Sequence, residues 1–270
     1  MSSPASGRKQ PFRAVRSPPA RDDRSALSCS DAVVTDRLYL DDAYLREFDA
    51  GVVECAEGWC RLTRTAFFPG GGGQPPDRGQ LAAGGEPLAV SGVREDDAGR
   101  IWHCVGRDLA PGTPVHGALD WPYRHALMRH HGLMHVVNAV AREAFDGIIT
   151  GVQIGPDRSR IDLKLPAFSR EQLPDFEGRV NAAVARGLRV AAAVITEEEF
   201  RARPELVRTL NVLPPVVDGR VRVVEMEGFD AQACGGTHVH STAEIGPARI
   251  AKFDNKGKDN KRFYWELGAP

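Results

Sequence analysis

Several features that would assign this chain to a special class are missing. Its 270 residues contain no apolar run long enough to cross a bilayer, and no apolar secretion signal stands near the start. No segment recurs at a fixed period, so a repeat architecture is not indicated. With 42% hydrophobic and 26% charged residues, the chain is expected to be a soluble globular protein of one or two domains, without a membrane partner.

Cysteine is scarce as well. The five cysteines are odd in number and scattered, at positions 29, 55, 60, 104 and 234, so no disulfide framework is suggested. We therefore expect a reducing, cytoplasmic location. Cys55, Cys60 and Cys104 fall in predicted strands and are expected to be packing residues.

The net charge of −1 is unevenly distributed. Residues 1–30 carry six basic and two acidic side chains and are rich in Ser and Pro, which predicts a disordered basic tail. This tail is either an extension without a function of its own or an arm that contacts RNA. Its prolines and the Asp22–Asp23 pair argue against an organelle transit peptide.

Residues 31–119 are expected to form a small β-barrel domain that carries a Gly-rich loop. Short, often alternating segments are separated by Gly, Pro and Asp, a pattern typical of small all-β units. The predicted strands are Arg37–Leu40, Glu47–Glu54, Trp59–Thr65, Gln80–Ala82, Leu88–Val93, Ile101–Val105 and Val115–Leu119.

Residues 120–270 are expected to form an α+β domain with helices packed on an antiparallel sheet. Asp120 is a candidate N-cap, and apolar residues then recur at helical spacing to about Phe145. Ser169 opens a capping box for a second helix that ends near Gly187, and a short helix is expected over Thr196–Arg203. The predicted strands are Ile148–Ile154, Arg160–Leu165, Arg220–Met226, Ala248–Asp254 and Arg262–Leu267.

Two pairs of metal-binding residue types stand out in this second part. His131 and His135 are four residues apart in the predicted long helix, so both project from one face. Cys234 and His238 have the same spacing in a Gly-rich turn. One thiolate and three imidazoles are a ligand set for one tetrahedral Zn²⁺. Because 98 residues separate the pairs, we expect a site assembled inside a folded domain; whether three or four side chains bind the metal stays open.

The Gly-rich segment Phe67–Gly79 contains four consecutive glycines followed by Gln74. Consecutive glycines permit positive φ and close approach of the backbone to a ligand, and the Gln74 amide can both donate and accept. The Lys-Ser/Thr end of a nucleotide-phosphate loop is missing. The segment is therefore either a substrate-binding loop or a flexible linker.

A cluster of basic residues surrounds the last predicted hairpin. Such a cluster is either a solvated turn or a surface that follows a phosphate backbone. Its members are Lys252, Lys256, Lys258, Lys261 and Arg262.

Six motifs in this order make the chain similar to the AlaX-type alanyl-tRNA editing proteins, free-standing relatives of the editing domain of alanyl-tRNA synthetase. The resemblance covers roughly residues 35–267 and matches the longer form, with a barrel before the editing domain. No segment resembles an aminoacylation core. The motifs are Phe67–Gly79, Arg129–His135, Arg220–Val224, Cys234–His238, Glu244–Gly246 and Asn255–Arg262.

The resemblance implies a zinc-dependent enzyme that hydrolyses the ester between a wrong amino acid, serine or glycine, and the 3′ end of the alanine tRNA. It would act as a monomer or weak homo-oligomer. Zinc would activate water or polarise the carbonyl, or else hold the substrate amine; a positioning or polarising role is preferred. By position, His131, His135, Cys234 and His238 would bind zinc, and Gln74, Gly132 and Thr237 would serve catalysis. The expected contacts with substrate or tRNA are Gly71, Gly72, Gly73, Asp77, Lys256, Lys258 and Arg262.

Gly132 departs from the family, which usually has Thr directly after the first zinc-binding His. Gly removes a hydroxyl that can bond a seryl substrate and a methyl group that limits the pocket. Either another group recognises serine and the usual substrate is kept, or the pocket admits threonine or a non-proteinogenic analogue of it. Two competing hypotheses from other classes are a tRNA-binding protein with a purely structural zinc and a hydrolase or transferase acting on a non-tRNA ester.

Five further polar positions carry predictions of their own. His130 and His240 are expected to be exposed. Asp162 is a candidate functional carboxylate on a strand, and Arg208 with Thr209 are candidate RNA contacts.

Overall fold

The computed structural model describes residues 33–207, 216 and 219–269. The predicted basic tail and the candidate RNA contacts Arg208 and Thr209 lie outside the described residues. No helix within these ranges is both long and apolar enough to span a membrane.

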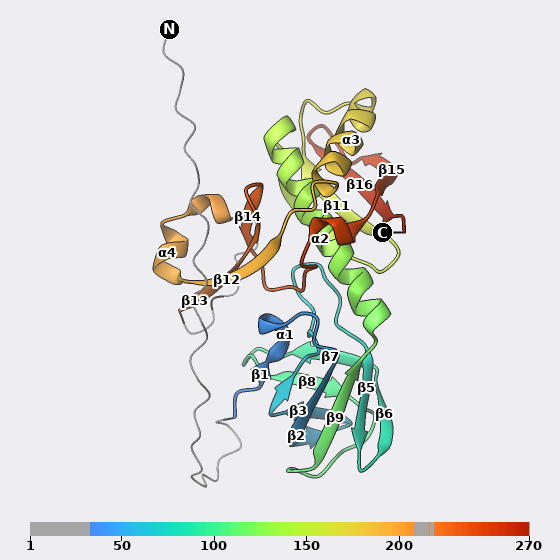
Figure 1. Ribbon diagram of the computed structural model, residues 1–270, viewed down its shortest axis with the longest axis vertical. Coiled ribbons are helices and arrows are strands. Elements are labelled where there is room, and N and C mark those ends of the chain that lie inside the picture. The colour runs from blue at the N-terminus through green and yellow to red at the C-terminus, as the bar shows by residue number, and fades with distance from the viewer. Residues whose placement is uncertain (1–32, 208–215, 217–218, 270) are drawn as a thin grey trace.

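The first part of the chain is built around one seven-stranded antiparallel sheet (Figure 1). Its strand order is β6-β5-β9-β2-β3-β8-β7. A short parallel pair, β1 with β4, stands beside it, and α1 follows β1 where the sequence predicted a strand to Leu40. The elements are β1 (Asp36–Arg37), α1 (Leu38–Asp41), β2 (Glu47–Ala56), β3 (Trp59–Leu62), β4 (Arg64–Thr65), β5 (Gly79–Ala83), β6 (Glu86–Val90), β7 (Gly92–Glu95), β8 (Ile101–Cys104) and β9 (Pro114–Leu119).

The expected closed barrel is not found among the described strands. The edge strands β6 and β7 do not pair with each other, so the sheet remains open. Strand β2 bends it, because β2 pairs with β9 through its first half and with β3 through its second, with a register shift between Val52 and Glu54. The curved sheet encloses a core of its own, which includes Phe48, Leu62, Phe67 and Leu81.

Cys55 and Cys60 form a disulfide, although the number and scatter of the cysteines suggested no disulfide framework. Both also pack in the core of the first sheet, as predicted for packing residues, and Cys60 is fully buried there. They lie directly opposite each other across the β2–β3 hairpin, with Cα atoms 4.1 Å apart. That cross-strand register cannot be read from cysteine spacing alone. Cys104 is free, as is Cys234.

Helix α2 (Trp121–Phe145) leads from the first sheet into the second half of the molecule (Figure 1). Its start is the predicted one, because the Asp120 side chain accepts a hydrogen bond from the Tyr123 amide and Pro122 stands in the first turn. Every residue from His130 to Ala141 is buried. A helix buried on all sides over three turns forms the centre of its domain.

The second half contains two antiparallel sheets around α2. The four-stranded sheet has the order β10-β11-β16-β15, and α2 and α3 pack on its apolar face, where Ile161, Leu163, Phe263 and Trp265 are fully buried. The elements are β10 (Ile148–Gln153), β11 (Ser159–Lys164), η1 (Arg170–Gln172), α3 (Leu173–Val184), β15 (Ala248–Asn255) and β16 (Asn260–Leu267). This α+β arrangement confirms the predicted fold class.

A three-stranded sheet, β12-β13-β14, lies on the other side of α2 (Figure 1). The sequence did not predict two of its strands, because alanine-rich β12 lacks the alternation of a strand and β14 is very short. Strand β14 leads directly to Cys234, so this sheet places the second ligand pair. The elements are β12 (Val190–Thr196), α4 (Glu197–Arg201), η2 (Pro204–Leu206), β13 (Arg220–Met226), β14 (Asp230–Ala233) and η3 (Thr242–Ile245).

Candidate functional site

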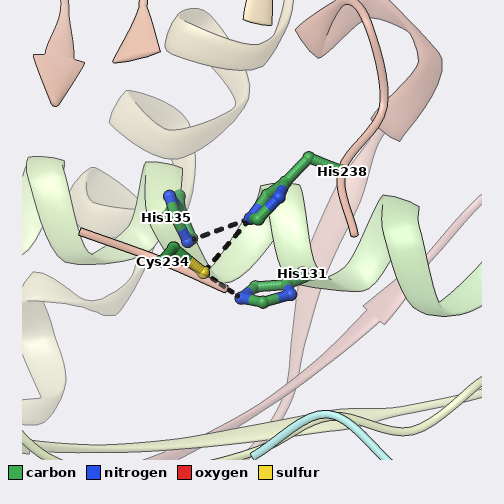
Figure 2. Close-up of side chains that lie close together, drawn as sticks. All are labelled: His131, His135, Cys234 and His238. Carbon is green, nitrogen blue, oxygen red and sulfur yellow. Dashed lines mark hydrogen bonds between the residues drawn. The ribbon is translucent and has the colours of Figure 1, made fainter. Parts of the chain in front are cut away.

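The four predicted metal ligands come together beside α2 (Figure 2). Their ligand atoms all lie within 4.8 Å of one another. The Cys234 Sγ atom is 3.4 Å from His131 Nε2 and 3.6 Å from His238 Nε2. His238 Nε2 is 3.2 Å from His135 Nε2. Helix α2 contributes two ligands at successive turns, and the loop after β14 contributes the other two.

These separations fit the edges of a tetrahedral zinc site. With Zn–N bonds of about 2.0–2.1 Å and Zn–S bonds of about 2.3 Å, neighbouring ligand atoms stand about 3.3 Å apart for two nitrogens and about 3.6 Å apart for nitrogen and sulfur. Three of the six separations among the four ligand atoms, at 3.2, 3.4 and 3.6 Å, are close to these values, and all six are within 4.8 Å. The Cys–His₃ donor set also suits zinc, which takes both thiolate and imidazole. The residues present therefore fit a bound Zn²⁺.

Burial determines the protonation of the ligands. It lowers the pKa of His131 to about 3 and lowers the pKa of His135 and His238 well below the usual value. The nearby Arg222 guanidinium adds to these shifts. The imidazoles are thus neutral at pH 7, which is the form that binds metal. Burial raises the pKa of the Cys234 thiol, and a bound cation would favour the thiolate instead.

Gln74, from the first half of the chain, lies directly behind this cluster. Its Oε1 accepts a hydrogen bond from His131 Nδ1 at 2.8 Å and from the Thr237 amide at 3.2 Å. Its Nε2 donates to Thr237 Oγ1 at 2.8 Å. With Nδ1 of His131 protonated, Nε2 presents its lone pair to a metal. Gln74 is only 2% exposed, so it orients the ligands from within the protein.

The Gly-rich loop brings Gln74 to this position. Gly70 to Gly73 all have positive φ, and Gly71 and Gln74 exchange two backbone hydrogen bonds of 3.0 Å. The Gly73 carbonyl accepts a hydrogen bond from the Ile154 amide at 2.8 Å, and a Cβ at Gly73 would lie 2.6 Å from the Val152 oxygen. This approach to the edge of β10 therefore requires glycine. Gly71 and Gly72 face open space, which leaves their backbone accessible to a ligand.

Asp77 lies near the end of the Gly-rich loop, where it forms a buried ion pair with Arg124. Its carboxylate accepts hydrogen bonds from Arg124 Nε and Nη2 and from the Phe68 amide. Arg124 and Asp77 are 0% and 1% exposed. The contacts of Asp77 are those of a residue that anchors the loop to α2, and its predicted role in substrate binding stays a prediction.

Gly132 lies beside His131 but is packed against the segment after the second ligand pair. A Cβ at this position would lie 3.2 Å from Ile245 Cδ1 and 3.3 Å from Val239 Cγ2. The space that a side chain would occupy is therefore already filled by two apolar side chains.

The basic residues of the last hairpin do not join the cluster. Lys256 and Lys258 are exposed in the turn between β15 and β16. Arg262 forms a two-bond ion pair with Asp162 on the polar face of the four-stranded sheet. Asp162 is thereby also placed away from the four ligands.

Arg222 and Tyr44 hold the ligand loop, and sequence reasoning assigned no role to either. Arg222 Nη1 donates to the carbonyls of Cys234 and Gly236, both at 2.9 Å. The Tyr44 hydroxyl donates to Glu244 at 2.6 Å, and its ring stacks on His240 at a centroid distance of 4.0 Å. Arg222 lies in one of the six motifs, but nothing in the sequence points to Tyr44.

His130 and His240, both predicted to be exposed, differ in their burial. His240 is exposed as expected. His130 is 1% exposed, and the prediction was wrong because α2 is buried on all sides at this level. Burial lowers the pKa of His130 to about 4.

One segment of the chain matches a family of domains from tRNA synthetases. Residues 221–264 match the family of the threonyl and alanyl tRNA synthetase second additional domain. This segment includes β13, β14, the Cys234–His238 loop and the last hairpin.

Longer relatives extend the similarity over most of the chain. The alanyl-tRNA editing protein AlaX-M of Methanosarcina mazei is 35% identical over 254 residues, which cover 87% of this chain and 97% of that protein. AlaX-M of Saccharolobus solfataricus is 34% identical over 237 residues, which cover 87% of this chain and 99% of that protein. The alanine–tRNA ligase of Korarchaeum cryptofilum is 40% identical, but the match covers only 26% of that enzyme. The chain belongs to the family of AlaX-M alanyl-tRNA editing proteins.

Proposed function

We propose that this protein is a zinc-dependent, trans-acting aminoacyl-tRNA deacylase that hydrolyses the ester of seryl- or glycyl-tRNA(Ala). The observation that carries the proposal is the buried Cys–His₃ cluster, whose ligand His131 is oriented by Gln74 from the Gly-rich loop. The names of the relatives, alanyl-tRNA editing protein and alanine–tRNA ligase, support the tRNA substrate.

The chain's own residues have distinct parts in this proposal. Gln74 fixes the tautomer and orientation of His131 and, by donating to Thr237 Oγ1, leaves the Thr237 hydroxyl proton free to donate. Gly71 and Gly72 offer open backbone beside this group, where the terminal nucleotide can approach closely. Arg222 keeps the carbonyls of the ligand loop in place.

A bound Zn²⁺ would supply Lewis acidity, either polarising the ester carbonyl or fixing the substrate amine. A positioning or polarising role is preferred, because four protein ligands leave little room for a water molecule.

A deacylation panel tests the proposal. Full-length protein is mixed with seryl-, glycyl-, alanyl- and threonyl-tRNA, and kcat/KM is measured for each ester. We expect seryl and glycyl esters to be cleaved and alanyl-tRNA(Ala) to be spared. Cys234→Ala should lose deacylation by at least a hundredfold and lose bound zinc, whereas Cys104→Ala is the matched control. Wild-type protein that is loaded with zinc and cleaves none of the esters would refute the proposal.

The alternative substrate, threonine or an analogue of it, depends on extra room at Gly132. Val239 and Ile245 already fill the position of a side chain there, which favours the usual substrates. In the same panel, the alternative requires cleavage of threonyl-tRNA that is lost in Gly132→Thr.

The runner-up is a tRNA-binding protein in which zinc has only a structural role. It requires that metal removal unfolds the protein and that the wild type has no esterase activity. Retained fold and RNA affinity in Cys234→Ala, with deacylation lost, would favour the enzyme. The other alternative is a hydrolase or transferase that acts on a non-tRNA ester. Its esterase activity would not be inhibited by uncharged tRNA.

Location and oligomeric state also stay predictions. The protein is expected to be cytoplasmic and to act as a monomer or weak homo-oligomer.

A further inference from the structure

Positive charge is concentrated in one sheet of this protein. Segments 148–165 and 248–269, which contain all four strands of the sheet β10-β11-β16-β15, carry nine basic and five acidic side chains. The remainder of residues 31–270 carries 20 basic and 29 acidic side chains. The chain has only six lysines, and five of them lie in these segments: Lys164, Lys252, Lys256, Lys258 and Lys261.

The strand register places much of this charge on one face. Ile161 and Phe263 alternate along their strands with Arg160, Asp162, Arg262 and Tyr264, and the apolar residues are buried under α2 and α3. Successive side chains of a strand point to opposite faces. The polar residues therefore form the outer face of the sheet, away from both helices.

Tyr264 stands at the centre of a row across this outer face. Arg160 is its partner on β11 and Lys252 its partner on β15. The Arg158 guanidinium and the Lys252 ammonium each lie 5.3 Å from the Tyr264 ring centroid. Cation–π attraction to the Tyr264 ring therefore helps to hold both cations on this face of the sheet.

Several of these cations have no acidic partner. Asp162 neutralises Arg262, and Asp254 neutralises Lys252. Within the part of the chain that the structure describes, five others form no ion pair with a carboxylate: Arg158, Arg160, Lys164, Lys256 and Lys258.

The β15–β16 turn is held in a defined shape. Lys261 is 4% exposed, and its ammonium donates to Asn255 Oδ1 at 2.9 Å and to the carbonyls of Lys258 and Gly257 at 3.1 and 3.3 Å. One buried lysine thus fixes the turn that presents Lys256 and Lys258 to solvent.

We infer that this outer face binds the phosphate backbone of the double-stranded stem of an RNA ligand. The inference rests on the proposed function and adds the surface on which the RNA lies. Unpaired cations on an otherwise acidic molecule match a polyanion. Double-stranded RNA is bound mainly through its shape, phosphates and 2′-hydroxyls, so this face does not read sequence. The Gly73–Ile154 hydrogen bond joins the edge of the same sheet to the loop that carries Gln74, which links the RNA surface to the metal cluster.

Binding of uncharged RNA tests this inference separately from catalysis. The probe is a short RNA hairpin with a single-stranded 3′ end, and its affinity for the zinc-loaded full-length protein is measured by fluorescence anisotropy at several salt concentrations. One variant combines Arg158→Gln, Arg160→Gln and Lys164→Gln; a second combines Lys256→Gln and Lys258→Gln. The charge-matched control combines Arg64→Gln, Arg94→Gln and Arg142→Gln, which are exposed elsewhere.

We expect each sheet variant to bind the hairpin at least tenfold more weakly. The slope of log affinity against log salt should decrease by about one for each phosphate that the variant no longer neutralises. A hairpin with a scrambled stem should bind the wild type equally well, and with charged tRNA the defect should appear mainly in KM. The control should bind within twofold of the wild type.

Two results would overturn the inference: sheet variants that bind with wild-type affinity and salt slope, or a control that loses as much affinity as they do. Neither depends on deacylation. Absence of deacylation in a wild-type protein that binds the hairpin would instead refute the proposed function.

Discussion

Gln74 connects the two halves of the protein at the level of a single side chain. One amide group contacts a ligand on α2 through His131 and the ligand loop through Thr237. Groups of this kind, which bond the outer nitrogen of a metal-binding histidine, tune metal affinity as well as geometry. The sequence indicated a functional glutamine here, and the structure gives it a specific partner.

Gln74→Ala is expected to lower zinc affinity by about 10–100-fold, the usual cost of losing such a partner. Gln74→Glu should retain more affinity than Gln74→Ala, because a carboxylate still accepts from His131 Nδ1. Competition with a chromogenic chelator measures both. Gln80→Ala, an exposed glutamine on β5, is the control. Wild-type affinity in Gln74→Ala would contradict the orienting role.

At the scale of elements, the Arg124–Asp77 pair attaches the Gly-rich loop to the first turns of α2. Arg124 also donates to the carbonyls of Ala43 and Ala66, so one guanidinium joins three segments. A buried ion pair adds little net stability over apolar packing, but removing one partner leaves an uncompensated charge in the interior.

Arg124→Met should therefore lower the free energy of unfolding by about 3–5 kcal/mol, as measured by urea denaturation. The exposed pair Arg179–Asp175 on α3 provides the comparison, and Arg179→Met should cost much less than Arg124→Met because exposed ion pairs contribute little. Equal costs for the two substitutions would show that burial of the first pair has no energetic consequence. Arg124→Lys retains the charge and provides a folded variant if Arg124→Met does not fold.

Elements were predictable from sequence where local signals agreed. Helix α2 has an N-cap, a proline in its first turn and a long apolar period, and its bounds are the predicted ones. Strands β12 and β14 carry no such signal and are stabilised by pairing with β13. Closure of the barrel depended on whether β6 and β7 meet, which no local pattern determines.

For the whole molecule, buried histidines should make stability fall in acid. Burial lowers the pKa of His103 to about 4, below about 6.5 in an unfolded chain. The unfolded state therefore binds a proton first as the pH falls. The stabilisation due to neutral His103 is complete above pH 6.5 and is lost between about 6.5 and 4, a change of about 3 kcal/mol. Burial also lowers the pKa of His130 and of the ligand histidine His131. Their protonation in acid therefore favours the unfolded state as well.

Urea denaturation of chelator-treated protein between pH 7.5 and 4 measures this decrease. His103→Gln preserves a donor for the Cys60 carbonyl and an acceptor for the Thr65 hydroxyl, and it should flatten the profile by about 3 kcal/mol. If His103→Gln retains the full wild-type slope, burial of His103 does not cause the acid sensitivity.

The sequence by itself determined the two ligand pairs, the helix that carries one of them and the glycine loop, because each depends on spacings of a few residues. Tertiary structure decided what those groups contact. It closed the cluster across 98 residues of chain, set Gln74 behind His131, filled the space at Gly132 and buried His130. It also brought Lys164 and Lys252 onto the outer face of one sheet and set Lys256 and Lys258 in the turn of its last hairpin. Backbone preferences act over a few residues, whereas these contacts arise only when distant segments pack together.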